Sequence, residues 1–248
     1  LSQRCAASLC PRQGRDVEQA LRTGGLTCPQ IGLEFVLVMN NSLLPSFAPE
    51  AAPLSERQRE ILERTLDLVQ ESGLANLTLK KVAERVGFSE PAIYRHFASK
   101  QELVLALVDL LRERLLGGMR AIAAETALPP RARIERMVRH HVGVLRTTRA
   151  LPFLLLAEGL ASGDSALLAK MNTVLRGYQA MLVALLAEAG VPPSPPLPHQ
   201  AMLCFGLPAV LGIQFRAFPD QAPDDAEIDA LVAHYVRALF PGAGGTAS

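Results

Sequence analysis

Residues 78–102 contain two short amphipathic helix patterns separated by a glycine, and this segment constrains the fold more than any other part of the chain. In the first pattern, apolar side chains recur at the spacing of one helix face, at Leu79, Val82, Ala83 and Val86. Gly87 suits the break because it adopts a positive φ at little steric cost. Ser89 is placed to cap the second helix, and Pro91 falls in its first turn, where no intrahelical donor is lost. A two-helix unit this short cannot bury a core alone.

The outward side of this segment is basic and aromatic. Ile93 and Phe97, four residues apart, face inward, so a polar row must face outward: Lys80, Lys81, Tyr94, Arg95, His96 and Lys100. Residues 78–100 hold five basic and two acidic side chains, a local net charge of +3, whereas the whole chain carries +1. Binding to phosphates and base edges accounts for such a row. A near-neutral chain with one basic patch favours site-directed DNA binding over general coating of DNA.

The spacing of these residues resembles the DNA-binding domain of the tetracycline-repressor (TetR) family of bacterial regulators. The resemblance runs without a gap through the pattern Thr78-x₃-Val82-Ala83-x₃-Gly87-x-Ser89-x₃-Ile93-Tyr94-x-His96-Phe97-x₂-Lys100-x₂-Leu103. It covers roughly residues 55–105, and the rest of the chain is similar to the family only in length and helical character. It implies a three-helix head that binds DNA and a helical body.

Eleven residues are assigned to DNA binding: Thr78, Lys80, Lys81, Ser89, Glu90, Pro91, Ala92, Tyr94, Arg95, His96 and Lys100. Arg95 is suited to bidentate binding of guanine, and Pro91 and Ala92 to contact with a thymine methyl group. Glu90 can accept a hydrogen bond from cytosine N4 or simply favour a helix N-terminus.

The remaining assignments concern phosphates. Thr78 can cap its helix and leave backbone N–H groups free for a phosphate. The resemblance implies a base or backbone contact for Lys80 and phosphate contacts for Tyr94, His96 and Lys100. For Tyr94, the alternative is a place in an aromatic core.

Helix signals continue along the chain, and no strand pattern or repeat accompanies them. Ser55-x-x-Gln58 and Ser99-x-x-Glu102 are capping boxes at the starts of two helices. Further helices are expected over 131–148, 152–161, 165–189, 199–217 and 225–239. The prediction is an all-α fold of about nine helices. The resemblance implies that residues 54–101 form a helix-turn-helix DNA-binding domain, and that residues 102–241 form a helical bundle for ligand binding and dimerisation.

Residues 1–53 differ from the rest of the chain. They are rich in Arg, Gly, Pro, Cys and Ser and show no sustained period. The first methionine in the sequence is Met39, so we expect residues 1–38 to derive from an upstream start codon. Residues 40–53, with three prolines, are expected to form a flexible arm. The whole segment is interpreted as a disordered or wrongly included extension.

Signals for other classes of protein are lacking in the sequence. The four cysteines, Cys5, Cys10, Cys28 and Cys204, form no Cys-x₂-Cys pair, so neither a zinc site nor a disulfide framework is expected, and reduced thiols fit the cytoplasm. No apolar run reaches the ~18 residues of a membrane span. No nucleophile elbow, phosphate loop or dinucleotide fingerprint is present. We therefore expect no catalytic residues, no metal, no cofactor and no membrane contact.

The predicted body offers few polar groups on apolar helices. Candidates to line a ligand pocket are His141, Glu158, Asn172 and Tyr178. Candidates for a dimer interface are Leu207 and Leu211 in 199–217, and Leu231 and Tyr235 in 225–239. A homodimer is expected because one short recognition helix reads few bases, so specific binding needs two half-sites of a palindromic operator.

The function expected from these features is sequence-specific control of transcription, as a repressor released by a small apolar ligand. Two alternatives stay open. One is a DNA-binding factor of the same fold without a small-molecule inducer, such as an activator or a nucleoid or division factor. The other is a helical enzyme with a DNA-binding head, which would need clustered ionisable groups on facing helices.

Overall fold

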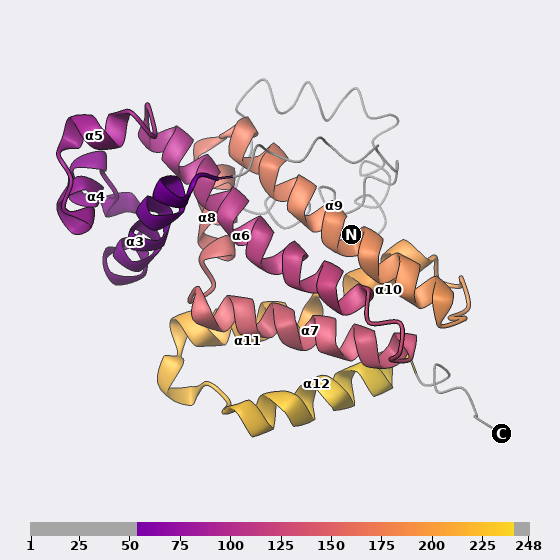
Figure 1. Ribbon diagram of the computed structural model, residues 1–248. Helices are drawn as coiled ribbons and strands as arrows, with labels where there is room; N and C mark the ends of the chain where they lie inside the picture. The colour runs from indigo at the N-terminus through magenta and orange to yellow at the C-terminus, as the bar shows by residue number, and fades with distance from the viewer. Residues whose placement is uncertain (1–53, 241–248) are drawn as a thin grey trace, which may run out of the picture. The chain divides into compact units, whose positions relative to one another are not determined.

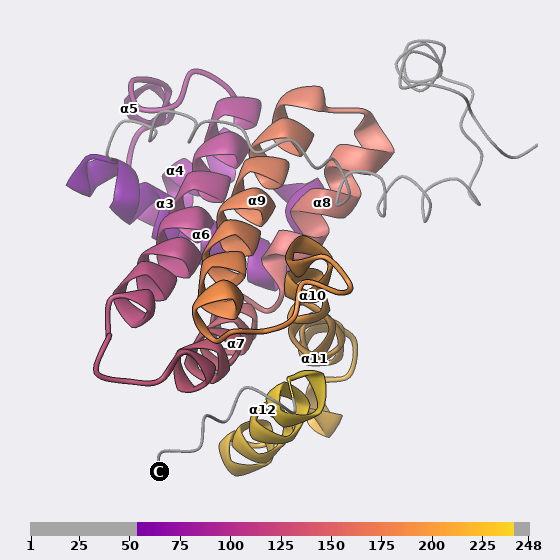
Figure 2. The same cartoon turned by 90° about the vertical axis from the view of Figure 1, so that its right-hand side faces the viewer.

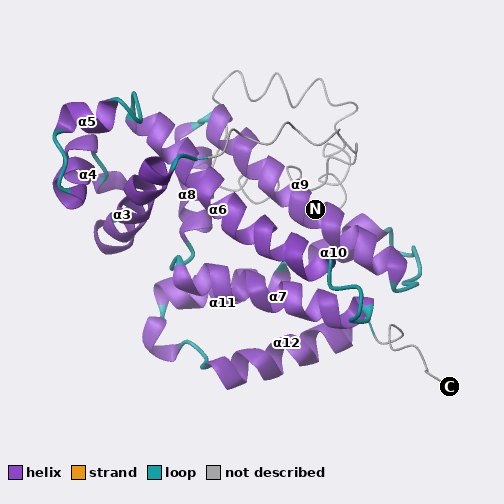
Figure 3. Ribbon diagram, in the orientation of Figure 1, coloured by secondary structure: helices purple, strands orange, loops and turns teal. Residues whose placement is uncertain are grey.

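The computed structural model describes residues 54–240, and in this range helices are joined by turns and loops, with no strand (Figure 3). The all-α prediction is confirmed. The α-helices are α3 (Glu56–Ser72), α4 (Leu79–Val86), α5 (Glu90–Tyr94), α6 (Lys100–Ala123), α7 (Pro130–Thr147), α8 (Leu151–Ser162), α9 (Ser165–Glu188), α10 (Leu197–Leu203), α11 (Gly206–Ala217) and α12 (Asp225–Leu239). Two short 3-10 helices, η2 (Leu74–Asn76) and η3 (Pro219–Gln221), lie between them. The interpretation of residues 1–53 lies outside the described residues.

The head consists of α3, α4 and α5, which lie together in Figure 1. Ser55 and Gln58 form the expected capping box at the start of α3. Thr78 caps α4 by accepting a hydrogen bond from the backbone N–H of Lys81 at 3.2 Å. Gly87 ends α4 in the left-handed region, with φ 80° and ψ 29°, so the turn uses the conformation that glycine adopts most readily.

The apolar core of the head extends into the body. Ile61, Phe97 and Leu103 are at most 1% exposed and belong to one cluster of buried side chains. The same cluster contains Leu151 of α8 and Leu167 of α9. A second cluster holds the distal half of α6 together with α7, the distal half of α9 and α10–α12. The first half of α6 therefore shares its core with the head, and the second half with the body.

α6 packs along α9 and α7, as Figures 1 and 2 show. Ion pairs join α6 to α3 through Arg59 with Glu113 and Arg114 with Glu63. These pairs are largely exposed, so each adds little stability by itself, but together they align the two helices.

The apolar segment 199–217 is two helices, so the prediction of one continuous helix there was wrong. α10 ends at Leu203 and α11 begins at Gly206. Pro208 has no N–H, so it cannot donate to the carbonyl of Cys204 four residues earlier. That carbonyl instead accepts from the Tyr178 hydroxyl at 3.4 Å, and the Leu203 carbonyl accepts from the Tyr235 hydroxyl. This break accounts for the tenth α-helix within residues 54–240.

The span Leu197–Ala217 is long and apolar enough to cross a membrane by length and composition alone. The core helices of soluble proteins pass the same test, and 39% of this span's most apolar window is buried inside the protein. Ala201, Cys204 and Leu211 from this span lie in the second core cluster. The absence of membrane contact stays a prediction.

Candidate nucleic-acid interface

The structure places the assigned DNA-binding residues at the surface of the head. Nine are exposed, Ala92 and His96 are half-buried, and none is buried. Tyr94 is 49% exposed, which favours the phosphate contact over a place in an aromatic core. Ile93 and Phe97 are buried, as the alternation of inward and outward side chains predicts.

The second helix of the pair is short. α5 spans Glu90–Tyr94, and Arg95 is its C-terminal cap residue, one position past the end of the helix. The backbone N–H groups of His96 and Phe97 both donate to the Ile93 carbonyl at 2.9 Å. The chain therefore makes a tight turn at this point. The side chains of Tyr94, Arg95 and His96 point in different directions around it.

Ser89 stands at the cap position of α5, but its side chain makes no capping hydrogen bond. The expectation that its hydroxyl caps this helix was wrong. The backbone of Ser89 performs part of this role, since its carbonyl accepts from the N–H groups of Ala92 at 2.9 Å and Ile93 at 3.3 Å. The Ser89 hydroxyl is exposed.

Two of the assigned lysines are held by backbone oxygens of the turn between α3 and α4. Lys81 Nζ donates to the Asn76 carbonyl at 3.0 Å, and Lys100 Nζ to the Leu74 carbonyl at 3.4 Å. Within residues 54–240, no hydrogen bond or ion pair engages the side chains of Lys80, Arg95 and His96. These three are available to a DNA ligand without losing a contact.

Arg85, one of the five basic residues counted in this segment, is neutralised by a partner on another helix. Its guanidinium binds the Glu71 carboxylate through two hydrogen bonds, one of 2.8 Å. These bonds lower the pKa of Glu71 and raise the pKa of Arg85. The basic patch is therefore weaker than the local sequence count indicates.

Arg57 is a cationic residue near this surface that the sequence pattern did not identify. Its guanidinium carbon lies 4.6 Å from the centre of the Phe88 ring, in the turn between α4 and α5. Contact between a cation and an aromatic face is stabilising. Because 31 positions separate the two residues in the sequence, no local spacing signals this contact.

In the body, His141 and Tyr178 come together. Their ring centres lie 5.0 Å apart, and the Phe205 ring lies 4.0 Å from that of Tyr178. Both residues are buried, and His141 Nδ1 has no hydrogen-bond partner. Burial lowers the pKa of His141 to about 3 and raises the pKa of Tyr178 well above its usual value. Cys204 is also buried here, and burial raises the pKa of its thiol to about 12, which argues against a reactive thiolate.

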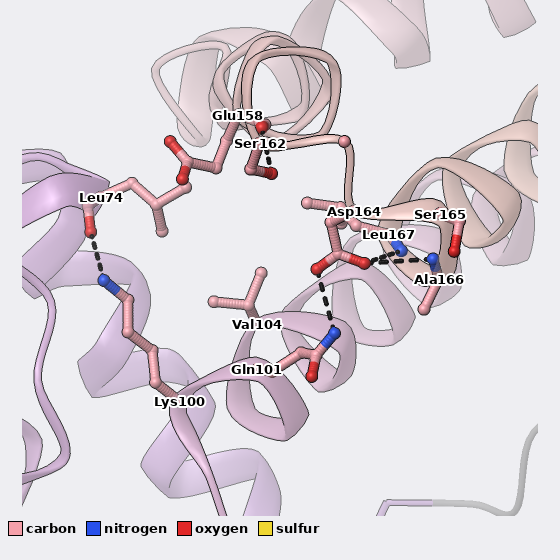
Figure 4. A pocket seen from close by; sticks show the side chains of 11 residues that line it. Leu74, Lys100, Gln101, Val104, Glu158, Ser162, Asp164, Ser165, Ala166 and Leu167 are labelled. Carbon is pink, nitrogen blue, oxygen red and sulfur yellow. Dashed lines mark hydrogen bonds between the residues drawn. The ribbon is translucent and has the colours of Figure 1, made fainter. Parts of the chain in front are cut away.

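The other two pocket candidates lie apart from this aromatic cluster. Asn172 is half-buried on α9. Glu158 is exposed near the end of α8, where it lines a pocket with Lys100 of the head (Figure 4). Within the described part of the chain, no group of three or more His, Cys, Asp or Glu side chains is arranged to hold a metal.

The dimer candidates differ in exposure. Leu231 is 40% exposed, whereas Leu211 is only 3% exposed and belongs to the core of the protomer. Leu207 and Tyr235 are half-buried. The most exposed large apolar side chains of the body all come from residues 203–218: Leu203, Val210, Ile213 and Phe218.

Comparison with known proteins extends the resemblance seen in the sequence. Residues 61–107 match the family described as bacterial regulatory proteins, tetR family. The nucleoid occlusion factor SlmA from Marinomonas sp. is 27% identical over 186 residues, which cover 75% of this chain and 86% of that protein.

Solved structures of regulators have the same fold. A TetR transcriptional regulator from Legionella pneumophila superposes with a TM-score of 0.63 at 16% identity, covering 75% of this chain and 98% of that one. A transcriptional regulator, FadR from Bacillus subtilis in complex with stearoyl-CoA, has a TM-score of 0.62 at 19% identity, covering 74% of this chain and 98% of that one. The matched segment is the one that holds α4 and α5 and the exposed basic row. Residues 61–107 of the chain therefore match the tetR family of bacterial regulatory proteins, and the chain has the fold of a TetR transcriptional regulator.

Proposed function

We propose that this DNA-binding regulator is a homodimeric repressor that binds a palindromic operator and leaves it when a small apolar ligand occupies the body. The observation that carries the proposal is the surface of the head. There, α5 presents exposed side chains beside the uncommitted Lys80, Arg95 and His96. This combination of base-edge and phosphate donors is what a major-groove helix needs.

Dimerisation supports specific binding. α5 has five residues, so one copy contacts few base pairs. One face of α11 is exposed and apolar. It consists of Val210, Ile213 and Ala217, which are three and four residues apart and therefore lie on the same side of the helix. We propose that this face, with Leu203 and Phe218 beside it and Leu231 of α12, packs against its copy across a two-fold axis.

The proposed inducer site is the aromatic cluster of the body. A buried nitrogen without a partner, such as His141 Nδ1, costs free energy that a polar group on a ligand would recover. The rings of Tyr178 and Phe205, which pack against each other and against His141, favour a largely hydrophobic molecule with one polar group. The FadR structure with stearoyl-CoA supports a ligand with a long apolar part. We propose a fall in operator affinity of about 5–150-fold when the ligand is bound.

The test has two stages. DNA retained by the full chain from a random pool is sequenced, and the enriched sites are expected to be two-fold symmetric. Apolar metabolites that raise the melting temperature are then titrated into the complex with that operator. Enriched sites without two-fold symmetry would contradict binding as a dimer. Ligands that stabilise the protein but leave operator affinity unchanged would contradict release by a ligand.

A second candidate function is favoured by one comparison. The SlmA relative is named as a nucleoid occlusion factor, and the similarity covers most of its length. We propose, as the alternative, a DNA-binding factor of cell division that needs no inducer. Binding sites spread over the chromosome, rather than close to promoters, would distinguish this role in a genome-wide binding experiment. Both functions place the protein in the cytoplasm, and neither requires catalysis.

A further inference from the structure

A pocket of about 670 Å³ lies where the head meets the α8–α9 corner, away from the aromatic cluster of the body (Figure 4). Its walls come from η2, from the start of α6, and from the end of α8 with the start of α9. Leu74, Val104 and Leu167 supply buried apolar surface. The pocket is of a size that suits a small organic molecule.

Two side chains of opposite charge line this pocket without forming an ion pair with each other. Lys100 Nζ makes only a long hydrogen bond of 3.4 Å, to the Leu74 carbonyl. The Glu158 carboxylate makes no hydrogen bond or ion pair within residues 54–240. Figure 4 shows the two side chains projecting from different walls. One positive and one negative group are therefore available to a ligand.

The third charged group of the pocket is already committed. Asp164 caps α9 by accepting from the N–H groups of Ala166 at 3.1 Å and Leu167 at 3.0 Å. Its other oxygen accepts from Gln101 Nε2 at 3.1 Å, which joins α6 to the α8–α9 corner. The charges left for recognition are therefore those of Lys100 and Glu158.

We propose that this pocket binds a small zwitterion whose ammonium group pairs with Glu158 and whose carboxylate pairs with Lys100, with a short apolar chain over Val104 and Leu167. A cation alone would leave Lys100 without an anionic partner, and an anion alone would be repelled by Glu158. A molecule with both charges meets both requirements. The site is separate from the inducer site proposed in the body.

The regulatory consequence rests on the proposed function, because it takes Lys100 as a phosphate contact. Lys100 cannot pair with a ligand carboxylate and a DNA phosphate at once. A bound zwitterion therefore removes one phosphate contact in each protomer. The walls of the pocket belong to the core that α8 and α9 share with the head, so the ligand would also hold the head in one position against these helices.

The first experiment measures the site without DNA. The full chain is titrated by calorimetry with γ-aminobutyrate, ε-aminocaproate and ω-aminocaprylate, which differ in the separation of their charges. Caproate and hexylamine carry one charge each and serve as ligand controls. We expect one of the amino acids to bind, and Glu158→Gln to weaken it by at least about tenfold. Lys100→Gln should weaken it similarly, and Lys100→Arg should retain it.

Asp220→Asn, which removes an exposed carboxylate in η3, is the matched protein control and should bind as the wild type does. Binding of caproate or hexylamine as tight as that of the best amino acid would overturn the proposal. So would unchanged binding by Glu158→Gln, or no binding by any of the three amino acids.

The second experiment measures coupling to DNA. Saturating amino acid should reduce the slope of log affinity against log salt by about 1 per protomer. Glu158→Gln should bind DNA normally and lose this response. A response that persists in Glu158→Gln would contradict coupling through this pocket. Should the chain bind no DNA, the proposed function fails, while the titration without DNA still decides whether the pocket binds zwitterions.

Discussion

At the scale of single residues, the outer face of the head contains side chains in two states. Lys80, Arg95 and His96 have no partner within residues 54–240, whereas Lys81 and Lys100 are bonded to backbone oxygens. The first group can contact DNA without losing an interaction. The second must exchange a carbonyl for a phosphate, which reduces the net gain from each contact.

Substitutions on this face should distinguish side chains that contact phosphates from a side chain that recognises a base. We expect Tyr94→Ala and His96→Ala to weaken binding to all DNA sequences alike, since phosphate contacts contain no sequence information. Arg95→Ala should instead relax the preference at one base position, at a cost of about 1–3 kcal/mol. Arg85→Ala is the control, because Glu71 already neutralises that arginine. Binding selections on each variant measure both effects, and equal losses for Arg85→Ala and Arg95→Ala would count against this assignment.

His141 gives a prediction about pH. Its pKa falls from an unfolded value near 6.5 to about 3 in the fold, so below the unfolded value the unfolded chain binds a proton that the folded chain does not. This group should therefore cost stability as the pH falls from about 6.5 towards 3, at about 1.4 kcal/mol per pH unit. His141→Phe removes the effect, so its advantage over the wild type in chemical unfolding should grow from about pH 8 to about pH 5. A constant difference across this range would show that His141 titrates normally.

The exposure of the side chains assigned to DNA binding could be predicted from the sequence because it depends on helix period alone. The partner of Arg85 could not, because Glu71 lies on another helix and tertiary packing decides the pair. The same holds for Arg57 over Phe88. Ser89 shows a further limit, since its sequence position fits a cap but its side chain makes no capping bond.

At the scale of elements, capping signals located the helix starts well. The Asp224–Glu227 capping box begins α12 where expected, and Ser55 does the same for α3. Ser99 caps α6, but Glu102 accepts from the N–H of Ala98 rather than that of Ser99, so this box is incomplete. The break between α10 and α11 was missed, although Pro208 was visible in the sequence, because the uniform apolar composition of 199–217 suggested one helix.

Adjacent glycines in α6 allow a test of helix packing against a matched control. A methyl group at Gly118 would lie 2.3 Å from the His140 ring, whereas one at Gly117 would meet nothing within 4 Å. Gly118→Ala should therefore destabilise the fold by about 1–3 kcal/mol. Gly117→Ala should stabilise it by about 0.5–1 kcal/mol through helix propensity. Thermal and urea unfolding compare the two, and similar changes in both variants would mean that His140 moves aside freely.

At the scale of the whole molecule, the exposed apolar face of α11 is the feature that a lone protomer does not explain. Leucines in 199–217 suggested an interface in the sequence. Which residues of this segment face outward, however, depends on where α11 begins. With its start at Gly206, Val210 and Ile213 point outward, while Leu211 points into the core. The apolar character of this segment could therefore be predicted from the sequence, whereas the side chains that it exposes could not.

Charge on this face should separate the proposed dimer. We expect Ile213→Glu to yield monomers whose operator affinity falls, because the half-sites are then bound independently. Ala226→Glu adds the same charge at an exposed position in the first turn of α12, and it should leave the dimer intact. Light scattering reports the mass of each variant. If Ile213→Glu forms dimers with the same dissociation constant as the wild type, the interface does not include this face of α11.

The core that the head shares with α8 and α9 has a consequence for protein engineering. A chimaera that exchanged only residues 54–101 between two regulators would leave buried residues of the donor head, such as Ile61 and Phe97, facing α6, α8 and α9 of the recipient, whose side chains were fitted to another core. A graft that also carries the first half of α6, α8 and the first half of α9 would move that core intact. The first half of α6 follows the head directly, and α8 leads into α9, so transplanted operator specificity should depend on two separate stretches of chain rather than one.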